Sequence, residues 1–301
     1  MKLRELSLFA GIGGGILGLR DFARPVVAVE ISPFCRTVLK RQQRRERLDA
    51  FPILDDIATF NGDRWRNQID LVTGGFPCQA FSLVHHGMSV AIDWWPEMLR
   101  VIDETRPPLV FAENVVETVI TRAAHDCNCL GYRSSIVCLR ASNVGAPHIR
   151  RRYWLLAYTS PEAVPDCSTV MKSDFWQAPP VGYVDGDPER KNRGGNYLER
   201  NFGLGFTVCT PTCAVNFITP YMLRRHPGCD NFAKAFGAKR PHPRVLEWLM
   251  GLPDGWTDLG SSGDWAQRYR AIGNAQVPHV ARAAFHFLCR SVKDSLAERA
   301  A

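Results

Sequence analysis

Short apolar runs alternate with stretches of helical periodicity over residues 1–158. The apolar runs are rich in Leu, Val, Ile and Phe, which is typical of strands buried in a sheet. They cover residues 6–10, 25–31, 70–74, 109–114, 133–142 and 151–159. The stretches with helical spacing cover residues 34–48, 95–105 and 115–131. Because strands that alternate with helices form sheets covered on both faces, the pattern predicts an α/β domain around a mostly parallel sheet.

The pattern changes after residue 158. Residues 160–243 are rich in Pro, Gly, Asn and Asp and contain no long periodic run, which predicts loops joined by short strands. Helical spacing returns over residues 243–252 and 276–296. The sequence therefore predicts three parts. They are an α/β core over 1–158, an irregular insert over 159–243, and a C-terminal segment over 244–301 that returns to the core.

The composition is that of an ordinary globular protein and restricts the function only loosely. Of 301 residues, 46% are hydrophobic and 22% charged, and the net charge of +7 tolerates a polyanion without requiring one. No secretory signal is visible, so we expect the ten cysteines to be reduced thiols in a cytoplasmic protein. The C-x-C and C-x3-C pairs fit no zinc site closely, so no metal is expected. No apolar run has the length that a membrane span needs, and no membrane association is expected.

A glycine-rich turn, LFAGIGGGILGL, follows the first predicted strand and precedes a helix. Glycines there let the backbone approach a ligand and expose amide groups at the N-terminus of the helix. Glu30 ends the second predicted strand, where a carboxylate can accept both hydroxyls of a ribose. Asp56 follows a third short strand and either reaches an adenine amino group or caps a helix. These features predict a cofactor that contains a nucleoside, although a nicotinamide dehydrogenase would show the same turn and acid.

The loop TGGFPCQAFS places Cys78 directly after Pro77, at the carboxyl end of a predicted strand. That edge of an open α/β sheet is where ligands bind, and proline stiffens the turn. Glu113 ends the next strand, and Arg150 and Arg152 alternate along the segment that enters the last one. A thiol, a carboxylate and a guanidinium group are therefore expected to converge. Taken singly, each has a plainer interpretation as a buried thiol or a solvated charge.

Together these motifs resemble those of the DNA cytosine-5 methyltransferase family. SLFAGIGG resembles the family's S-adenosylmethionine turn, GGFPCQAFS its catalytic loop, ENV its catalytic acid motif and PHIRRRYW its arginine motif. EWLMGLPDGW and RAIGNAQVP resemble its two C-terminal motifs. The matches follow the family's order and cover residues 3–158 and about 243–290. The loop and the ENV string at this spacing are highly specific.

The resemblance implies a Rossmann-like α/β core that binds S-adenosylmethionine, with a small irregular target recognition region over 159–243. It implies methylation at C5 of a cytosine flipped out of double-stranded DNA. Cys78 would add to C6 and make C5 nucleophilic, while Glu113 would protonate N3. Arg152, supported by Arg150, would hold the base O2 and the acid.

The resemblance also assigns binding residues. Those expected around the cofactor are Phe9, Ala10, Gly11, Gly13, Gly14, Glu30, Ile31, Asp56, Ile57, Gly75, Pro77, Asn274 and Ala275. Those expected to contact DNA are Gln79, Ser82, Arg190, Arg193, Arg224 and Arg225. The chain departs from the family pattern at His148, where most members have Gln, and over 89–102, where Trp94 and Trp95 are expected to fill the surface.

Three other functions remain open at this stage. The chain could be a relative of this family that acts on tRNA, although the recognition region of such relatives is typically different. It could also be a DNA-binding protein with an impaired site. A dehydrogenase leaves the proline–cysteine loop unexplained. For the leading hypothesis, the expected setting is a restriction–modification system with a separate cognate endonuclease, or an orphan or phage-borne enzyme, and we expect a monomer.

Overall fold

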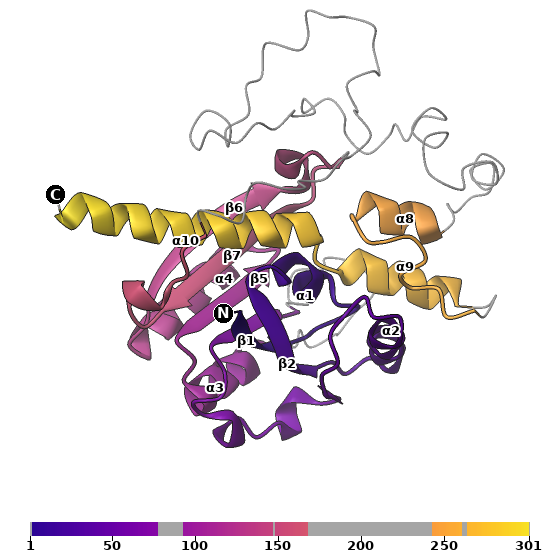
Figure 1. Cartoon of the computed structure of the whole chain (residues 1–301), viewed down its shortest axis with the longest axis horizontal. Helices are drawn as coiled ribbons and strands as arrows, with labels where there is room; N and C mark the ends of the chain where they lie inside the picture. Colours follow the sequence, from indigo (N-terminus) through magenta and orange to yellow (C-terminus); the bar gives the residue numbers. More distant parts are fainter. Residues whose placement is uncertain (1, 78–92, 147, 168–242, 261–263, 301) are drawn as a thin grey trace, which may run out of the picture.

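The computed structural model describes residues 2–77, 93–146, 148–167, 243–260 and 264–300. These residues form an α/β fold around one seven-stranded sheet with the strand order β3-β2-β1-β4-β5-β7-β6 (Figure 1). The strands are β1 (Leu3–Leu8), β2 (Ala23–Val29), β3 (Ile53–Leu54), β4 (Leu71–Gly75), β5 (Leu109–Asn114), β6 (Arg133–Arg140) and β7 (Arg151–Tyr158). The order reverses between β1 and β4, as in doubly wound folds.

The sheet is mostly parallel, as the sequence predicts. Strands β3, β2, β1, β4 and β5 all pair in parallel. Strand β7 is the exception, because it runs antiparallel to both β5 and β6. This reversal places the start of β7 beside the end of β5, with Asn114 opposite Tyr153 and Glu113 opposite Trp154. A side chain entering β7 can therefore reach the carboxyl end of β5.

Helices cover both faces of the sheet. One buried cluster joins the sheet to α1 (Gly14–Leu19), α2 (Pro33–Arg44) and α10 (Pro278–Ala300). The other joins it to α3 (Trp95–Thr105) and α4 (Glu117–Cys129). Short 3-10 helices lie in the connections at Ile57–Thr59, Asp63–Trp65, Ala141–Val144 and Pro161–Ala163. The two-layer covering predicted from the alternating pattern is confirmed for this part of the chain.

Local signals set the ends of the helices. Ser32 caps α2 by accepting a hydrogen bond from the backbone N–H of Cys35, and Pro33 occupies the first turn, where it costs no hydrogen bond. Helix α4 ends just before Gly131, whose φ of +92° suits a glycine after a helix. The helix predicted over 115–131 therefore stops where the sequence indicates.

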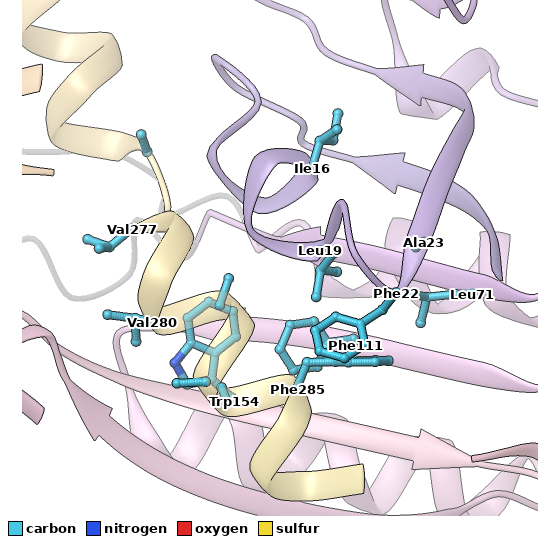
Figure 2. Close-up of a cluster of buried hydrophobic side chains, with 14 of the residues drawn as sticks. Ile16, Leu19, Phe22, Ala23, Leu71, Phe111, Trp154, Val277, Val280 and Phe285 are labelled. Carbon is cyan, nitrogen blue, oxygen red and sulfur yellow. The ribbon is translucent and has the colours of Figure 1, made fainter. Parts of the chain in front are cut away.

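An aromatic cluster fixes α10 on the sheet (Figure 2). The ring of Phe285 lies 5.1 Å from Phe22 and 5.2 Å from Phe111, measured between ring centroids. Phe111 in turn stacks on Trp154 at 5.1 Å. Phe285 lies in α10 and is fully buried, so these contacts hold α10 against β5 and against the residue that precedes β2.

The segment before α10 is docked on the same side. It contains α8 (Pro243–Leu249) and α9 (Trp265–Asn274), beside α2 in Figure 1. The indole N–H of buried Trp256 donates to the carbonyl of Ile12, and the Trp256 carbonyl accepts from Gln42 at 2.6 Å. The C-terminal segment thus contacts the turn after β1, while the domain boundaries as a whole stay a prediction.

A buried ion pair joins the two small helices to each other. Arg268 of α9 lies 3.1 Å from Glu247 of α8, and both are almost fully buried. Thr257 donates its backbone N–H to the same carboxylate oxygen at 2.8 Å, and its hydroxyl also contacts that oxygen. The sequence did not predict α9, because its polar residues give only a weak apolar face.

Candidate active site

The candidate site lies where the carboxyl ends of β1, β2, β4 and β5 meet the start of β7. In a doubly wound sheet this edge, at the reversal of strand order, is where ligands bind. The glycine turn leaves β1, Glu30 follows β2, Gly75 ends β4, and Glu113 lies near the end of β5. Arg152 enters on β7. The topology therefore brings together residues that are widely separated in the sequence.

Glu113 is a buried carboxylate paired with an arginine. Its Oε1 atom lies 2.8 Å from Nε of Arg152, and only 8% of the residue is exposed. Burial raises the pKa of Glu113, while the charges of Arg152 and then Arg150 oppose the rise. The same Oε1 has no aligned hydrogen-bond partner among the described residues. A carboxyl group in this setting keeps a proton more readily than a solvated one.

Arg150 binds the returning C-terminal segment, and its expected support of Arg152 at the base stays a prediction. Its guanidinium donates to the carbonyls of Gly273 and Ala275, at 2.9 and 2.8 Å, at the end of α9. Burial and the neighbouring Arg152 lower the pKa of Arg150 to about 10. Arg150 therefore holds the C-terminal segment beside the carboxylate, whereas Arg152 pairs with Glu113 directly.

The turn after β1 has the strained backbone that its glycines permit. Gly11 and Gly13 have φ values of +55° and +86°, and Phe9 also lies in this region at +51°. The N–H of Gly11 donates to Oε2 of Glu30 at 2.7 Å, and the N–H of Ser32 donates to Oε1 at 2.8 Å. Glu30 thus fixes the turn to the end of β2. Its pKa is raised by burial, against the effect of these two hydrogen bonds.

At Gly14 a side chain would point into the chain itself rather than into open space, and the expected cofactor contact of its backbone stays a prediction. A Cβ atom on Gly14 would lie 2.2 Å from the carbonyl oxygen of Gln276. Gly14 is thus required for the close packing of α1 against the C-terminal segment. Gly11 differs, because the nearest atom to its Cβ would be 4.0 Å away. Of these two glycines, only Gly11 has free space where a side chain would project.

Further predicted cofactor residues lie around this turn. Ile31 is 61% exposed next to Glu30, and Ala275 is buried. Ile57 is buried in the other apolar cluster. Asp56 accepts the N–H of Ala58 at 2.9 Å and caps a 3-10 helix, which is the plainer of its two interpretations. Its contact with adenine stays a prediction, as does a cofactor role for Ala10, Pro77 and Asn274.

The start of the predicted catalytic loop is fixed from two sides. The carbonyl of Phe76 accepts from Asn114 at 3.0 Å, and the Phe76 ring packs on Trp95 at 5.0 Å. Asn114 itself was not assigned a role from the sequence, although it belongs to the ENV string. Cys78, Gln79, Ser82, Arg190, Arg193, Arg224 and Arg225 lie outside the described residues.

The residues that depart from the family pattern have defined contacts. Trp94 lies edge-on to Phe9 at 6.4 Å between centroids, next to the glycine turn. Trp95 is buried beneath it and donates to Asp126 at 2.8 Å, so only Trp94 fills the surface as expected. His148 Nε2 lies 2.8 Å from the carbonyl oxygen of Leu249, and burial lowers the pKa of the ring.

Sequence reasoning also missed Gln276. Its Nε2 atom lies 3.5 Å from Oε2 of Glu113. The GNAQVP motif indicated a cofactor contact at Asn274 and Ala275, and nothing in the string pointed from Gln276 to the acid. The contact arises only because the segment before α10 returns to the edge of the sheet.

The described ranges contain no group of three or more His, Cys, Asp or Glu placed to hold a metal ion. Nor does any helix in those ranges have the length and apolar character that a membrane span requires.

Comparisons with known proteins agree with this geometry. The family model for C-5 cytosine-specific DNA methylases matches residues 3–202. The Type II methyltransferase M.CviJI of Paramecium bursaria Chlorella virus IL3A is 29% identical over 62% of this chain and 52% of its own length. This chain therefore spans about half of that relative. M.NgoMIV of Neisseria gonorrhoeae is 28% identical over 97% of this chain and 99% of its own.

Solved structures show the same fold. The chain matches Spodoptera frugiperda DNMT2 with a TM-score of 0.61 and 17% identity, over 95% of this chain and 99% of that one. It matches S. pombe Dnmt2 with a TM-score of 0.59 and 18% identity, over 97% and 99%. At such identities the likeness concerns the fold alone. The family model covers well over half of the chain, and the chain belongs to the C-5 cytosine-specific DNA methylase family.

Proposed function

We propose that this protein transfers a methyl group from S-adenosylmethionine to C5 of a cytosine within a specific sequence of double-stranded DNA. The observation that carries the proposal is the buried Glu113–Arg152 pair, 2.8 Å apart, at the sheet edge where β4 ends at Gly75. The family match and the Type II relatives support the DNA substrate.

The residues around the glycine turn fit S-adenosylmethionine. Gly11 leaves space above a backbone held by Glu30, and Ile31 offers exposed apolar surface beside it. The second lone pairs of the Glu30 carboxylate can accept ribose hydroxyls while the backbone bonds remain. Phe9, Glu30 and Ile31 would therefore hold the nucleoside. When bound, S-adenosylmethionine supplies an electrophilic methyl group on its sulfonium.

The chain's own residues perform the remaining steps. The Cys78 thiolate adds to C6 of the flipped cytosine, and Glu113 gives its proton to N3, so C5 becomes nucleophilic. Arg152 keeps Glu113 in place and is free to bind the O2 atom through its remaining N–H groups. After methylation a solvent base takes the C5 proton, the electrons of that C–H bond re-form the C5–C6 double bond and expel the thiolate, and the N3 proton returns to Glu113.

The setting of this activity is also part of the proposal. Gln79, Ser82 and the arginines 190, 193, 224 and 225 contact the DNA, and the insert over 159–243 selects the sequence. The protein acts as a cytoplasmic monomer, with a separate endonuclease where it belongs to a restriction–modification system. The tRNA alternative differs from it in the nucleic acid that is methylated, and under the DNA-binding alternative neither DNA nor RNA is methylated.

The test is expression in a bacterial strain that lacks DNA methylation, followed by methylome sequencing. We expect 5-methylcytosine at one defined sequence motif. Bisulfite sequencing of RNA from the same cells is the matched measurement. Methylated RNA with unmethylated DNA would replace this proposal by the RNA alternative, and no methylation in either would favour the impaired DNA-binding protein.

A further inference from the structure

The strongest unassigned feature of the site is the side chain of Gln276. It comes from the three residues between α9 and α10, and its Nε2 atom lies 3.5 Å from Oε2 of Glu113. Arg152 lies on the other oxygen, Oε1, at 2.8 Å. The two carboxylate oxygens are therefore faced by two different donors, one charged and one neutral.

Three glycines leave the space that Gln276 occupies. A Cβ on Gly15 would lie 2.2 Å from Oε1 of Gln276, and a Cβ on Gly75 would lie 2.9 Å from both Nε2 of Gln276 and Oε2 of Glu113. A Cβ on Gly14 would collide with the Gln276 backbone. Helix α1 and the end of β4 thus both enclose this side chain.

The backbone that carries Gln276 is also held firmly. Arg150 binds the carbonyls of Gly273 and Ala275 just before it, and Val277 just after it is buried in the main core. Arg150 and Arg152 therefore act on the same carboxylate by two routes. Arg152 touches it directly, and Arg150 fixes the segment that presents Gln276.

We propose that Gln276 is a positioning residue that fixes the orientation of Glu113 for proton transfer. This inference rests on the proposed function. The 3.5 Å separation is long for a hydrogen bond, and such contacts shorten when substrate fills a site. A carboxamide suits the role because its N–H groups bind the ionised acid and its oxygen can accept from the protonated one. His148, at the position where the family usually has Gln, is directed to Leu249 instead.

The first test measures the pKa of Glu113 in the protein alone, by NMR of ¹³C-labelled glutamate over a pH titration. The Glu113 signal is assigned by its absence in Glu113→Gln. Gln276→Met keeps the length of the side chain and removes the donor. We expect it to raise the pKa of Glu113, because a hydrogen bond that favours the ionised form is lost. Gln276→Glu adds a like charge and should raise that pKa further.

A second variant disturbs the contact between Gln276 and Glu113 without changing either residue. Gly15→Ala places a methyl group against Oε1 of Gln276 and should displace the carboxamide, so the pKa of Glu113 should rise as in Gln276→Met. Gly273→Ala is the control in the same segment, because its Cβ would meet no atom within 4 Å. Gln68→Met removes an exposed carboxamide at the opposite edge of the sheet. Both controls should leave the pKa unchanged.

The second test is single-turnover methylation against pH. Gln276→Met should slow the step about ten-fold and move the alkaline limb of the profile to higher pH, since the acid form of Glu113 persists. A merely structural role would lower the rate without moving the limb. An unchanged Glu113 pKa in Gln276→Met and Gly15→Ala overturns the inference even where wild-type protein methylates DNA. Should wild-type protein methylate nothing, the proposed function fails, and the titration still decides whether Gln276 acts on Glu113.

Discussion

Replacing Glu30 by Ala removes a buried carboxylate that accepts hydrogen bonds from Gly11 and Ser32, at 2.7 and 2.8 Å. Each bond to a charged acceptor contributes roughly 1.5–3 kcal/mol, and the two amide groups would be left unpaired. Since such losses are not fully additive, we expect the free energy of unfolding to fall by about 2–4 kcal/mol. The strained turn at Gly11 would also lose its attachment to β2.

The cofactor should be affected as well. If the same carboxylate binds the ribose hydroxyls, Glu30→Ala should weaken S-adenosylmethionine binding by roughly 1.5–3 kcal/mol, about ten- to a hundred-fold. Isothermal titration calorimetry measures this affinity, and urea unfolding followed by circular dichroism measures stability. Both should be measured at a temperature where the variant stays folded.

Glu104→Ala is the matched control. Glu104 also accepts a glycine N–H at 2.7 Å, from Gly62, and pairs with Arg100 at 2.7 Å, away from the glycine turn. Its loss should lower stability and leave cofactor affinity unchanged. Unchanged affinity in Glu30→Ala, or an equal loss in Glu104→Ala, would refute the assignment of Glu30 to the cofactor.

Three further changes test other parts of the account. Glu113→Gln should retain DNA binding and lower the single-turnover rate about 100-fold or more, because an amide cannot deliver the proton to N3. A wild-type rate in this variant would show that Glu113 is not the acid. Burial raises the pKa of Glu5 to about 7, so the contribution of Glu5 to stability should fall by on the order of 3 kcal/mol as pH rises from about 4.5 to 7. In urea titrations at several pH values, Glu5→Gln should reduce the total fall of wild-type stability by about that amount. Phe285→Ala should lower the free energy of unfolding by about 3–5 kcal/mol, because it opens a cavity between Phe22 and Phe111, and a loss below about 1 kcal/mol would contradict that packing.

The strands and most helices could be predicted because their signals are local. Apolar runs, helical spacing and a terminating glycine at 131 depend on neighbouring residues only. The boundaries moved by a few residues: the strand expected over 6–10 is Leu3–Leu8, and the helix expected over 34–48 ends at Arg44. Helix α9 was missed because its apolar face is short. The helix is held instead by packing on α8, where Arg268 pairs with Glu247.

The site could be predicted only in part, for a related reason. The order of motifs indicated that Glu113 and Arg152 meet, and the structure places them 2.8 Å apart. The sequence could not distinguish Gly11, which has free space where a side chain would project, from Gly14, which packs against the returning chain. The two glycines belong to the same turn of the sequence. They differ because only Gly14 packs against Gln276, which is more than 250 residues away. Contacts of that range carry no local signal.

The central claim, covalent catalysis by Cys78, is tested most directly by trapping the protein on DNA with 5-fluorocytosine at the target. Fluorine cannot leave C5 as a proton does, so the adduct at C6 cannot resolve after methyl transfer. The account predicts a protein–DNA band that survives denaturing electrophoresis and depends on S-adenosylmethionine. Cys78→Ser should abolish the band and Cys138→Ser should retain it, because a serine alkoxide is hardly accessible near neutral pH. Methylation of ordinary DNA by wild-type protein, with no such band on the fluorinated target, would contradict the claim.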